Sequence, residues 1–469
     1  MKTRMFLLLT SLLYAGCGVG PNYRRPVIQT PAAFRAPGYL PPQEAASIAD
    51  LQWFEIFDDP ELQNLVRTAL RQYYDLRDAV ARVNQARASL GITRSNQVPN
   101  LGAGASVQFN RLSRDGATPI REELLPSQNR AFGTAALELL SFEIDIWGRL
   151  RRETEAARAN LLGAEETRKA VVTTLVSDVA TAYLTLRELD YTLEISQRTL
   201  QTREQSLELT QSRQKGGVAT LLDLRQAEQL VQTSAETIPA IQQQIGQTEN
   251  RINLLLGQSP GSVARGRILT DQKMPPEVPA GLPSALLERR PDIRAAEQDL
   301  IAANAEIGVA RAAYFPRLSL SGFLGGASTQ LTSLFSSNGT TWNFAPQVTQ
   351  PIFTAGRIKS GVKFTEAQRE RALIRYQKTI QTAFAEVSNA LIAYQRVRER
   401  REKQTALVTT LEDRVRLAYV RYRGGVDTQL NALDADRDLF QAQLDLARIR
   451  LEELLTIVQL YKALGGGWQ

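Results

Sequence analysis

The chain has 469 residues, of which 43% are hydrophobic, 22% charged and only 7% aromatic, a composition typical of long helices with solvated faces rather than of a compact enzyme. It has no histidine and one cysteine, so the commonest general base is absent and neither an internal disulfide nor a cysteine-rich metal site can form. The net charge is +7, but Lys and Arg are spread among Asp and Glu along predicted helices. We therefore expect no enzyme, no metal site and no nucleic-acid partner.

Residues 1–16 predict a signal peptide. Two basic residues precede an apolar run over 5–13 that is too short to span a membrane, and small residues then lead to Cys17. The pattern fits an ordinary secretory signal with a chance cysteine, or a bacterial lipoprotein signal. It resembles the lipobox, although Tyr14 stands where that motif usually has leucine. On the lipoprotein interpretation, Cys17 becomes the mature N-terminus and carries a diacylglycerol and an N-acyl chain, and no other cofactor is expected.

After the signal, the sequence divides into an anchored segment and two tandem copies of one unit. Residues 17–58 are rich in proline and lack periodicity, which predicts an extended, lipid-anchored segment. The two copies span 59–257 and 291–469, and a Pro- and Gly-rich linker over 258–290 joins them.

The duplication is clearest at a junction between a helix and a strand. The stretch DLRDAVARVNQARASLGITRSNQVPNL at 75–101 aligns without a gap with DIRAAEQDLIAANAEIGVARAAYFPRL at 292–318. In both stretches a helical pattern gives way to a strand at a proline, Pro99 or Pro316. Proline lacks an amide hydrogen and restricts the residue before it to extended geometry, so it favours this change.

Each copy is predicted to contain a helix, a β-hairpin with a polar loop, a very long helix and a return helix, in that order. In the first copy these elements lie at about 59–95, 100–146, 149–215 and 218–256; in the second they lie at about 292–313, 317–353, 357–423 and 426–464. A helix of about 65 residues would reach about 100 Å at 1.5 Å per residue, too long for one compact domain. Each long helix is expected to end at a tip turn formed by a pair of glycines, Gly216–Gly217 or Gly424–Gly425, because glycine adopts positive φ readily.

The second predicted strand contains ELLSFEIDIW, which would place Leu140, Phe142, Ile144 and Ile146 on one face and acidic residues on the other. Such alternation predicts a strand with one apolar and one wet face. Four strands are too few to close a barrel in a membrane, because an open edge leaves unpaired backbone groups in lipid. If these strands lie in a membrane, several chains must share one barrel.

The sequence resembles a known family, the TolC-like outer-membrane efflux proteins, and within it the lipoprotein branch. The resemblance extends from Cys17 to about Gly465. It is carried by CGVGPNYRRP, WFEIFDDPELQNLVRTAL, SFEIDIWGR, LLERRPDIRAAEQDLIAANAEIGVARAAYFPRLSLSG, QPIFTAGRI and RYRGGVDTQLNALDADRDLFQAQ.

The resemblance implies a mixed membrane α+β fold. Three chains would form a homotrimer whose twelve-stranded β-barrel, with four strands from each chain, continues as a long periplasmic α-helical barrel. The linker over 258–290 would lie in the equatorial region of this barrel. The protein would be lipid-anchored in the outer membrane of a Gram-negative bacterium. It would act as a passive exit duct for small molecules, coupled through a periplasmic membrane-fusion (adaptor) protein to an inner-membrane pump of the RND type.

The resemblance also implies a gate at the periplasmic tip. Leu430 and Asp434 would line the closed constriction, and Asp427 and Asn431 share their helical face. The alternative is a solvated acidic cap at a helix start, where aspartate is stabilising anyway. Gln429 lies on the opposite face and is expected to matter little.

Four further residues are candidate contacts that support the gate or link the tips. They are Asp223, Arg421, Tyr422 and Arg423. Asp427 stands where TolC has an arginine. Two other functions stay open: the outer-membrane component of a type I protein secretion system, or a non-conducting envelope scaffold. A scaffold would have no need of amphipathic membrane strands.

Overall fold

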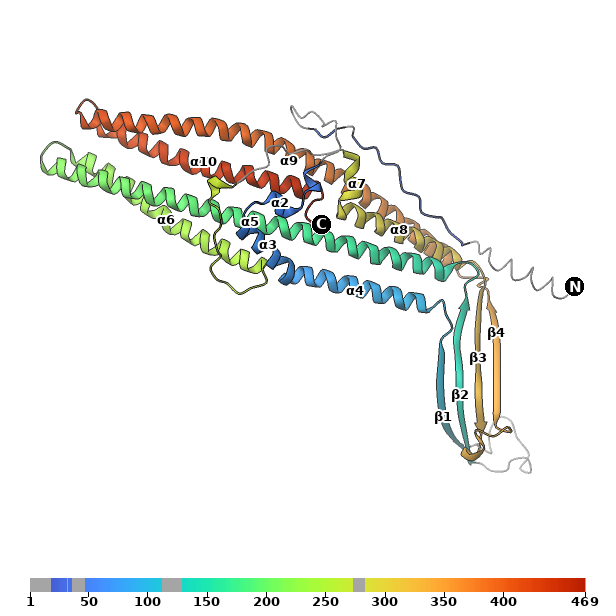
Figure 1. Ribbon diagram of the computed structural model, residues 1–469. Coiled ribbons are helices and arrows are strands. Elements are labelled where there is room, and N and C mark those ends of the chain that lie inside the picture. Colours follow the sequence, from blue (N-terminus) through green and yellow to red (C-terminus); the bar gives the residue numbers. More distant parts are fainter. Residues whose placement is uncertain (1–17, 32, 36–46, 112–128, 273–282, 469) are drawn as a thin grey trace. The chain divides into compact units, whose positions relative to one another are not determined.

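The computed structural model describes residues 18–31, 33–35, 47–111, 129–272 and 283–468 (Figure 1). The expected lipidation site, Cys17, and the signal peptide lie outside the described residues. The helices and strands are α2 Trp53–Ile56, α3 Pro60–Gln72, α4 Tyr74–Ser95, β1 Leu101–Arg111, β2 Asn129–Ile144, α5 Arg149–Lys215, α6 Leu221–Leu255, α7 Leu286–Arg289, α8 Pro291–Ala312, β3 Arg317–Ser328, β4 Thr340–Thr349, α9 Arg357–Arg423 and α10 Gln429–Ala463. Among these described helices, none is long and apolar enough to cross a membrane.

The duplication is visible in the lengths of the helices. The long helices α5 and α9 have 67 residues each, the return helices α6 and α10 have 35 each, and α4 and α8 have 22 each. Each copy also contributes two strands, so the expected combination of long helices and four antiparallel strands is confirmed.

The chain divides into two compact units. One unit comprises residues 1–27, 82–164 and 296–376 and contains the sheet, and the other comprises residues 28–81, 165–295 and 377–469 and is helical.

The four strands form one antiparallel sheet in the order β1-β2-β3-β4 (Figure 1). Residues opposite each other on paired strands share a face of the sheet. One face is apolar: Leu137 of β2 lies opposite Leu324 of β3, and Leu324 lies opposite Trp342 of β4. The other face is polar, with Ser106 opposite Thr134. The prediction of one apolar and one wet face is therefore confirmed.

A β-bulge changes which residues of β2 belong to the apolar face. The register with β3 shifts between Leu139 and Phe142, so these two residues share the apolar face although they are three positions apart. The expected alternation is confirmed for Phe142 and Ile144, which pair with Leu320 and Leu318 of β3, whereas Leu140 lies in the bulge, where one extra residue is inserted into the strand. The strand also ends at Ile144 and not at 146, since the carboxylate of Asp145 accepts a hydrogen bond from the amide of Arg151 at the start of α5 (3.0 Å).

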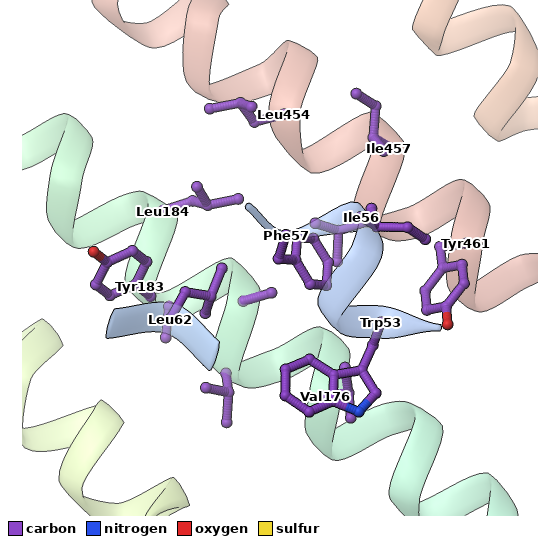
Figure 2. Packing of buried hydrophobic residues seen from close by; sticks show 14 of the residues in the cluster. Trp53, Ile56, Phe57, Leu62, Val176, Tyr183, Leu184, Leu454, Ile457 and Tyr461 are labelled. Carbon is purple, nitrogen blue, oxygen red and sulfur yellow. The ribbon is translucent and has the colours of Figure 1, made fainter. Parts of the chain in front are cut away.

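The core of the helical unit packs short N-terminal helices against the long ones. Figure 2 shows Trp53, Ile56 and Phe57 beside Val176 of α5 and Tyr461 of α10. The prediction of an extended segment over 17–58 was therefore wrong for its last part. Large apolar side chains spaced three and four apart bury themselves by forming a helical turn.

The helix expected over 59–95 is in fact two helices, α3 and α4, that meet at Tyr73. Tyr73 has extended geometry (φ −60°, ψ 127°), and its hydroxyl donates to the carboxylate of Asp75 at 2.7 Å. The carbonyl of Gln72 lies so close to Gly257 that a Cβ there would come within 2.8 Å of its oxygen. No proline or glycine marks this break in the sequence, so periodicity alone could not locate it.

A buried aspartate connects α3, α5 and the linker. Asp59 is fully buried and accepts hydrogen bonds from the Tyr183 hydroxyl, the Gln272 amide and the backbone of Arg267, each at 2.9 Å. A Cβ on Gly266 would lie 2.1 Å from its carboxylate, so only glycine fits there. Burial alone would raise the pKa of Asp59, but these hydrogen bonds together lower it below its usual value.

We expect Asp59→Ala to destabilise the helical unit by about 3 kcal/mol, because it leaves several buried donors without an acceptor. The stabilising contribution of Asp59 should be complete above its unfolded-state pKa, near ~3.9, and should be lost as the pH falls through its lower folded-state pKa. Thermal unfolding followed by circular dichroism between pH 2 and pH 7 would measure both effects.

The matched control is Asp58→Ala, which removes a half-exposed carboxylate paired with Arg267 (3.2 Å) and should cost less than about 1 kcal/mol. Equal losses for the two variants would contradict the role assigned to Asp59.

Candidate functional site

The helix hairpins α5–α6 and α9–α10 each have a tight turn at the tip, and the two turns are of the same type (Figure 1). The amides of Val218 and Val426 donate to the carbonyls of Arg213 (2.9 Å) and Arg421 (3.1 Å). Gly217 and Gly425 have φ 73°. This is the Schellman arrangement, in which a residue at positive φ lets the chain satisfy the last carbonyls of a helix.

Only the second glycine of each predicted pair has the left-handed conformation. Gly216 and Gly424 do not have positive φ, and a Cβ on Gly216 would make ordinary contacts at 3.5 Å. The glycine pairs therefore lie at the turns as expected, but only the second glycine of each pair has the positive φ that was expected of both.

The two return helices begin differently. At α6, Thr220 and Asp223 form a capping box: the Thr220 amide donates to the Asp223 carboxylate (2.8 Å), and the Asp223 amide donates to the Thr220 hydroxyl (3.1 Å). Asp223, predicted as a tip contact, thus caps its own helix.

At α10, Thr428 is the N-cap residue and its side chain makes no capping hydrogen bond, whereas Asp427, the residue before it, gathers several donors. Its carboxylate accepts hydrogen bonds from Arg421 (3.0 Å), Asn431 (2.7 Å) and the backbone of Thr428 (2.8 Å). The Arg421 side chain, then Asn431 and the backbone amide, hold the pKa of Asp427 below its usual value. The structure therefore brings together three of the predicted tip residues, and the contact closes the turn within one chain.

Tyr422 connects the second hairpin to α5. It is buried, its hydroxyl donates to Gln429 (3.1 Å), and the Gln429 amide donates to the Thr210 hydroxyl (2.6 Å). The Arg213 guanidinium lies 4.5 Å from the Tyr422 ring centre. Gln429 is thus a buried link between helices, so the expectation that it would matter little was wrong.

A buried ion pair holds the same helices farther from the tip. Arg203 of α5 donates to Asp436 of α10 (2.7 Å) and to the Ser234 hydroxyl of α6 (2.6 Å). Both charged side chains are largely removed from solvent, with 3% and 10% exposed. Sequence analysis missed this pair because Arg203 and Asp436 are far apart in the chain and no motif links them.

The predicted gate residues Leu430 and Asp434 lie one helical turn apart on α10. Leu430 is 47% exposed. Asp434 is 39% exposed and pairs with Arg437 at 3.2 Å. The tip therefore presents an exposed apolar side chain and a partly exposed, ion-paired carboxylate on one helical face. Among the described residues, no group of three His, Cys, Asp or Glu side chains could hold a metal ion.

Arg423 lies beside another tyrosine of the same helix. Its guanidinium is 6.0 Å from the ring centre of Tyr419, whose hydroxyl lies 3.4 Å from that of Ser206 on α5. Arg423 therefore flanks a second contact between α9 and α5.

In the sheet-containing unit, the second helix-to-strand junction is tied to the turn between β2 and α5. Pro99 lies between the end of α4 and β1, and Pro316 lies between α8 and β3. The Trp147 indole donates to the Pro316 carbonyl (2.8 Å) and stacks on Phe315 at 4.7 Å. The prolines therefore lie where helix changes to strand.

The N-terminal segment is fixed to the same junction. The Val19 amide donates to the Trp147 carbonyl (2.9 Å), and a Cβ on Gly20 would come within 2.5 Å of the Gly308 Cα on α8. The chain just after Cys17 is therefore held at the end of the strands.

Comparisons with known proteins agree with this architecture. A family model described as outer membrane efflux protein matches residues 65–258 and 282–466. The toluene efflux pump outer membrane protein TtgC of Pseudomonas putida is 38% identical over 100% of this chain and 96% of its own length. Outer membrane protein OprJ of Pseudomonas aeruginosa is 36% identical over 98% of this chain and 95% of its own length. The open-state structure of the Neisseria gonorrhoeae MtrE outer membrane channel is 31% identical, with a TM-score of 0.87 over 97% of this chain and 99% of that one.

We expect Gly217→Ala to destabilise the first hairpin tip by about 1 kcal/mol, because the added Cβ strains a residue at positive φ. Gly216→Ala, its neighbour, should be neutral or slightly stabilising. Hydrogen exchange measured by mass spectrometry on tip peptides would compare the two, and faster exchange in both variants or in neither would contradict this assignment.

Proposed function

Because this chain belongs to the outer membrane efflux protein family, we propose that it forms a passive trimeric duct through which small molecules leave the cell. It is an efflux component of the outer membrane of a Gram-negative bacterium, with a large periplasmic helical part. The named relatives are channel or pump components, so the chain itself performs no chemistry in this proposal.

The sheet carries the proposal. It has one apolar and one polar face, and β1 and β4 each have one edge with no partner among the described strands. In lipid, such edges are satisfied only by further strands. Three copies joined edge to edge give twelve strands with the apolar face toward lipid and the polar face toward water. An envelope scaffold would have no use for such a sheet.

The long helices support coupling to partners. A helix of 67 residues spans about 100 Å, which suits a tunnel that reaches far into the periplasm. We propose that its tips meet a periplasmic adaptor protein and, through it, an inner-membrane pump of the RND type that supplies the energy. Secretion of a protein substrate is the alternative, and the named relatives are efflux components.

We assign the gate to the exposed tip of α10. Around a three-fold axis, Leu430 would form an apolar ring and Asp434 an acidic ring. Three converging carboxylates attract cations and repel one another. The contacts of Asp427 with Arg421 and of Tyr422 with Gln429 would hold each tip in its closed position.

The duct is tested by single-channel recording in planar bilayers. Wild-type protein, cross-linked to verify three chains, should conduct. Leu430→Ala should raise the conductance because it removes an apolar constriction, and Asp434→Ala should raise it and also lower cation selectivity because it removes the acidic ring. A monomer that is stable and does not conduct would refute the proposed function.

Asp445→Ala is the matched control for Asp434→Ala. Asp445 lies on the same helix, is 40% exposed, and faces Arg448 at 3.9 Å with the same spacing as Asp434 and Arg437. Since it lies farther from the tip, its removal should change conductance and selectivity less. Equal effects of the two substitutions would show that the gate is not at Asp434.

We also propose that Cys17 is lipidated. The residues that follow it are fixed at the end of the strands, which suits an anchor at the membrane boundary. Metabolic labelling with a palmitate analogue should mark the wild type and not Cys17→Ser. Equal labelling would overturn the anchor, whereas channel activity should survive the substitution because the strands insert independently.

A further inference from the structure

The connection between β3 and β4 folds back onto the apolar face of the sheet. Gly326 and its cross-strand partner Ala135 belong to that face, with Leu137 and Leu324. A Cβ on Gly326 would lie 1.8 Å from the carbonyl oxygen of Leu334. Leu334 is only 7% exposed, so this connection lies against the sheet and does not extend away from it.

This fold-back leaves a cavity of about 540 Å³ on the apolar face, which we call the sheet cavity. Its floor is made of small residues, and its walls are larger apolar side chains. The lining includes Ala103, Ala105, Ala135, Leu137, Leu324, Gly326, Leu334 and Phe335. No charged side chain is among its described lining residues.

We propose that the sheet cavity binds one acyl chain of an outer-membrane lipid. This inference rests on the proposed function, because it requires the apolar face to contact lipid. Leu324 is 59% exposed and Phe335 84% exposed, and such side chains at the rim of an open cavity suit an apolar ligand that arrives from the bilayer.

Packing explains why a lipid acyl chain would stay bound in the sheet cavity and not exchange freely with the other lipids of the bilayer. Lipid tails are as apolar as leucine, so burial from water gives no preference within a membrane. A hollow lined by small residues, in contrast, leaves its walls without contact partners unless something fills it. Water is a poor filler for an apolar hollow. An acyl chain restores these contacts, and the volume lies within the usual range for ligand sites.

The position of the cavity indicates which lipids reach it. The strands β1 and β3 begin directly after α4 and α8, so the connection between β3 and β4 belongs to the end remote from the helices. With the helical part in the periplasm, this end faces outward. The bound chain therefore comes from the outer leaflet and not from the lipid on Cys17.

Native mass spectrometry tests the proposal on the full-length protein purified from outer membranes in mild detergent. The wild type should retain a non-covalent lipid on each chain after washing. Ala105→Phe and Ala135→Phe should lower this retention about tenfold, because each phenylalanine fills the floor; a tenfold loss corresponds to about 1.4 kcal/mol. Val107→Phe, on the same strand and face but outside the cavity, should retain lipid like the wild type.

Each outcome decides the question. Equal retention in the cavity variants and the wild type, or a wild type that retains no lipid, would overturn the proposal. The covalent lipid on Cys17 is told apart because its mass stays with the chain after denaturation; non-covalent lipid that is lost in Cys17→Ser but kept in Ala105→Phe would overturn the proposal. All variants are first cross-linked and recorded in bilayers: a trimer that conducts but fails the lipid test refutes only this inference, whereas a wild type that neither trimerises nor conducts refutes the proposed function. Gly326→Ala, which displaces the Leu334 wall, is a second variant should phenylalanine prevent folding.

Discussion

The constraint on which this structure depends is the outer edge of β1 and of β4, whose backbone groups pair with no other strand that the structure describes. Each of these two strands pairs with one described neighbour along one edge, and the proposed trimer would pair the other edge with a neighbouring chain. The bulge between Leu139 and Phe142 places both of these side chains on the apolar face of the sheet.

In the helical unit, specific contacts hold the very long helices in register. Apolar packing around Trp53 and Tyr461 fixes one region, and the buried pair of Arg203 with Asp436 fixes another. Burial of an ion pair is costly unless its hydrogen bonds are satisfied, and here Ser234 supplies one. Such directional contacts specify a single arrangement of helices, whereas leucine and alanine surfaces permit sliding.

The sequence predicted the elements that repeat or alternate, because periodicity is a local property. The two long helices and the position of the tip glycines follow directly from it. The sequence could not predict features that depend on contacts between residues far apart in the chain. The break at Tyr73, the contact of Gly266 with Asp59, and the link from Tyr422 through Gln429 to Thr210 all arise from tertiary packing. The capping box of Thr220 with Asp223 is, in contrast, a local pattern that the sequence could have revealed, and the role of Asp223 as a tip contact stays a prediction.

The equal lengths of α5 and α9 restrict how this protein can change over evolutionary time. One residue added to a helix advances everything beyond it by about 1.5 Å and turns it by about 100°, so every later side chain would face the wrong neighbour. An insertion in one copy would have to be matched in the other to keep both tips level. Gains and losses of residues should therefore accumulate between strands, as the longer connection of the first hairpin already illustrates, while the helices diverge by substitution alone.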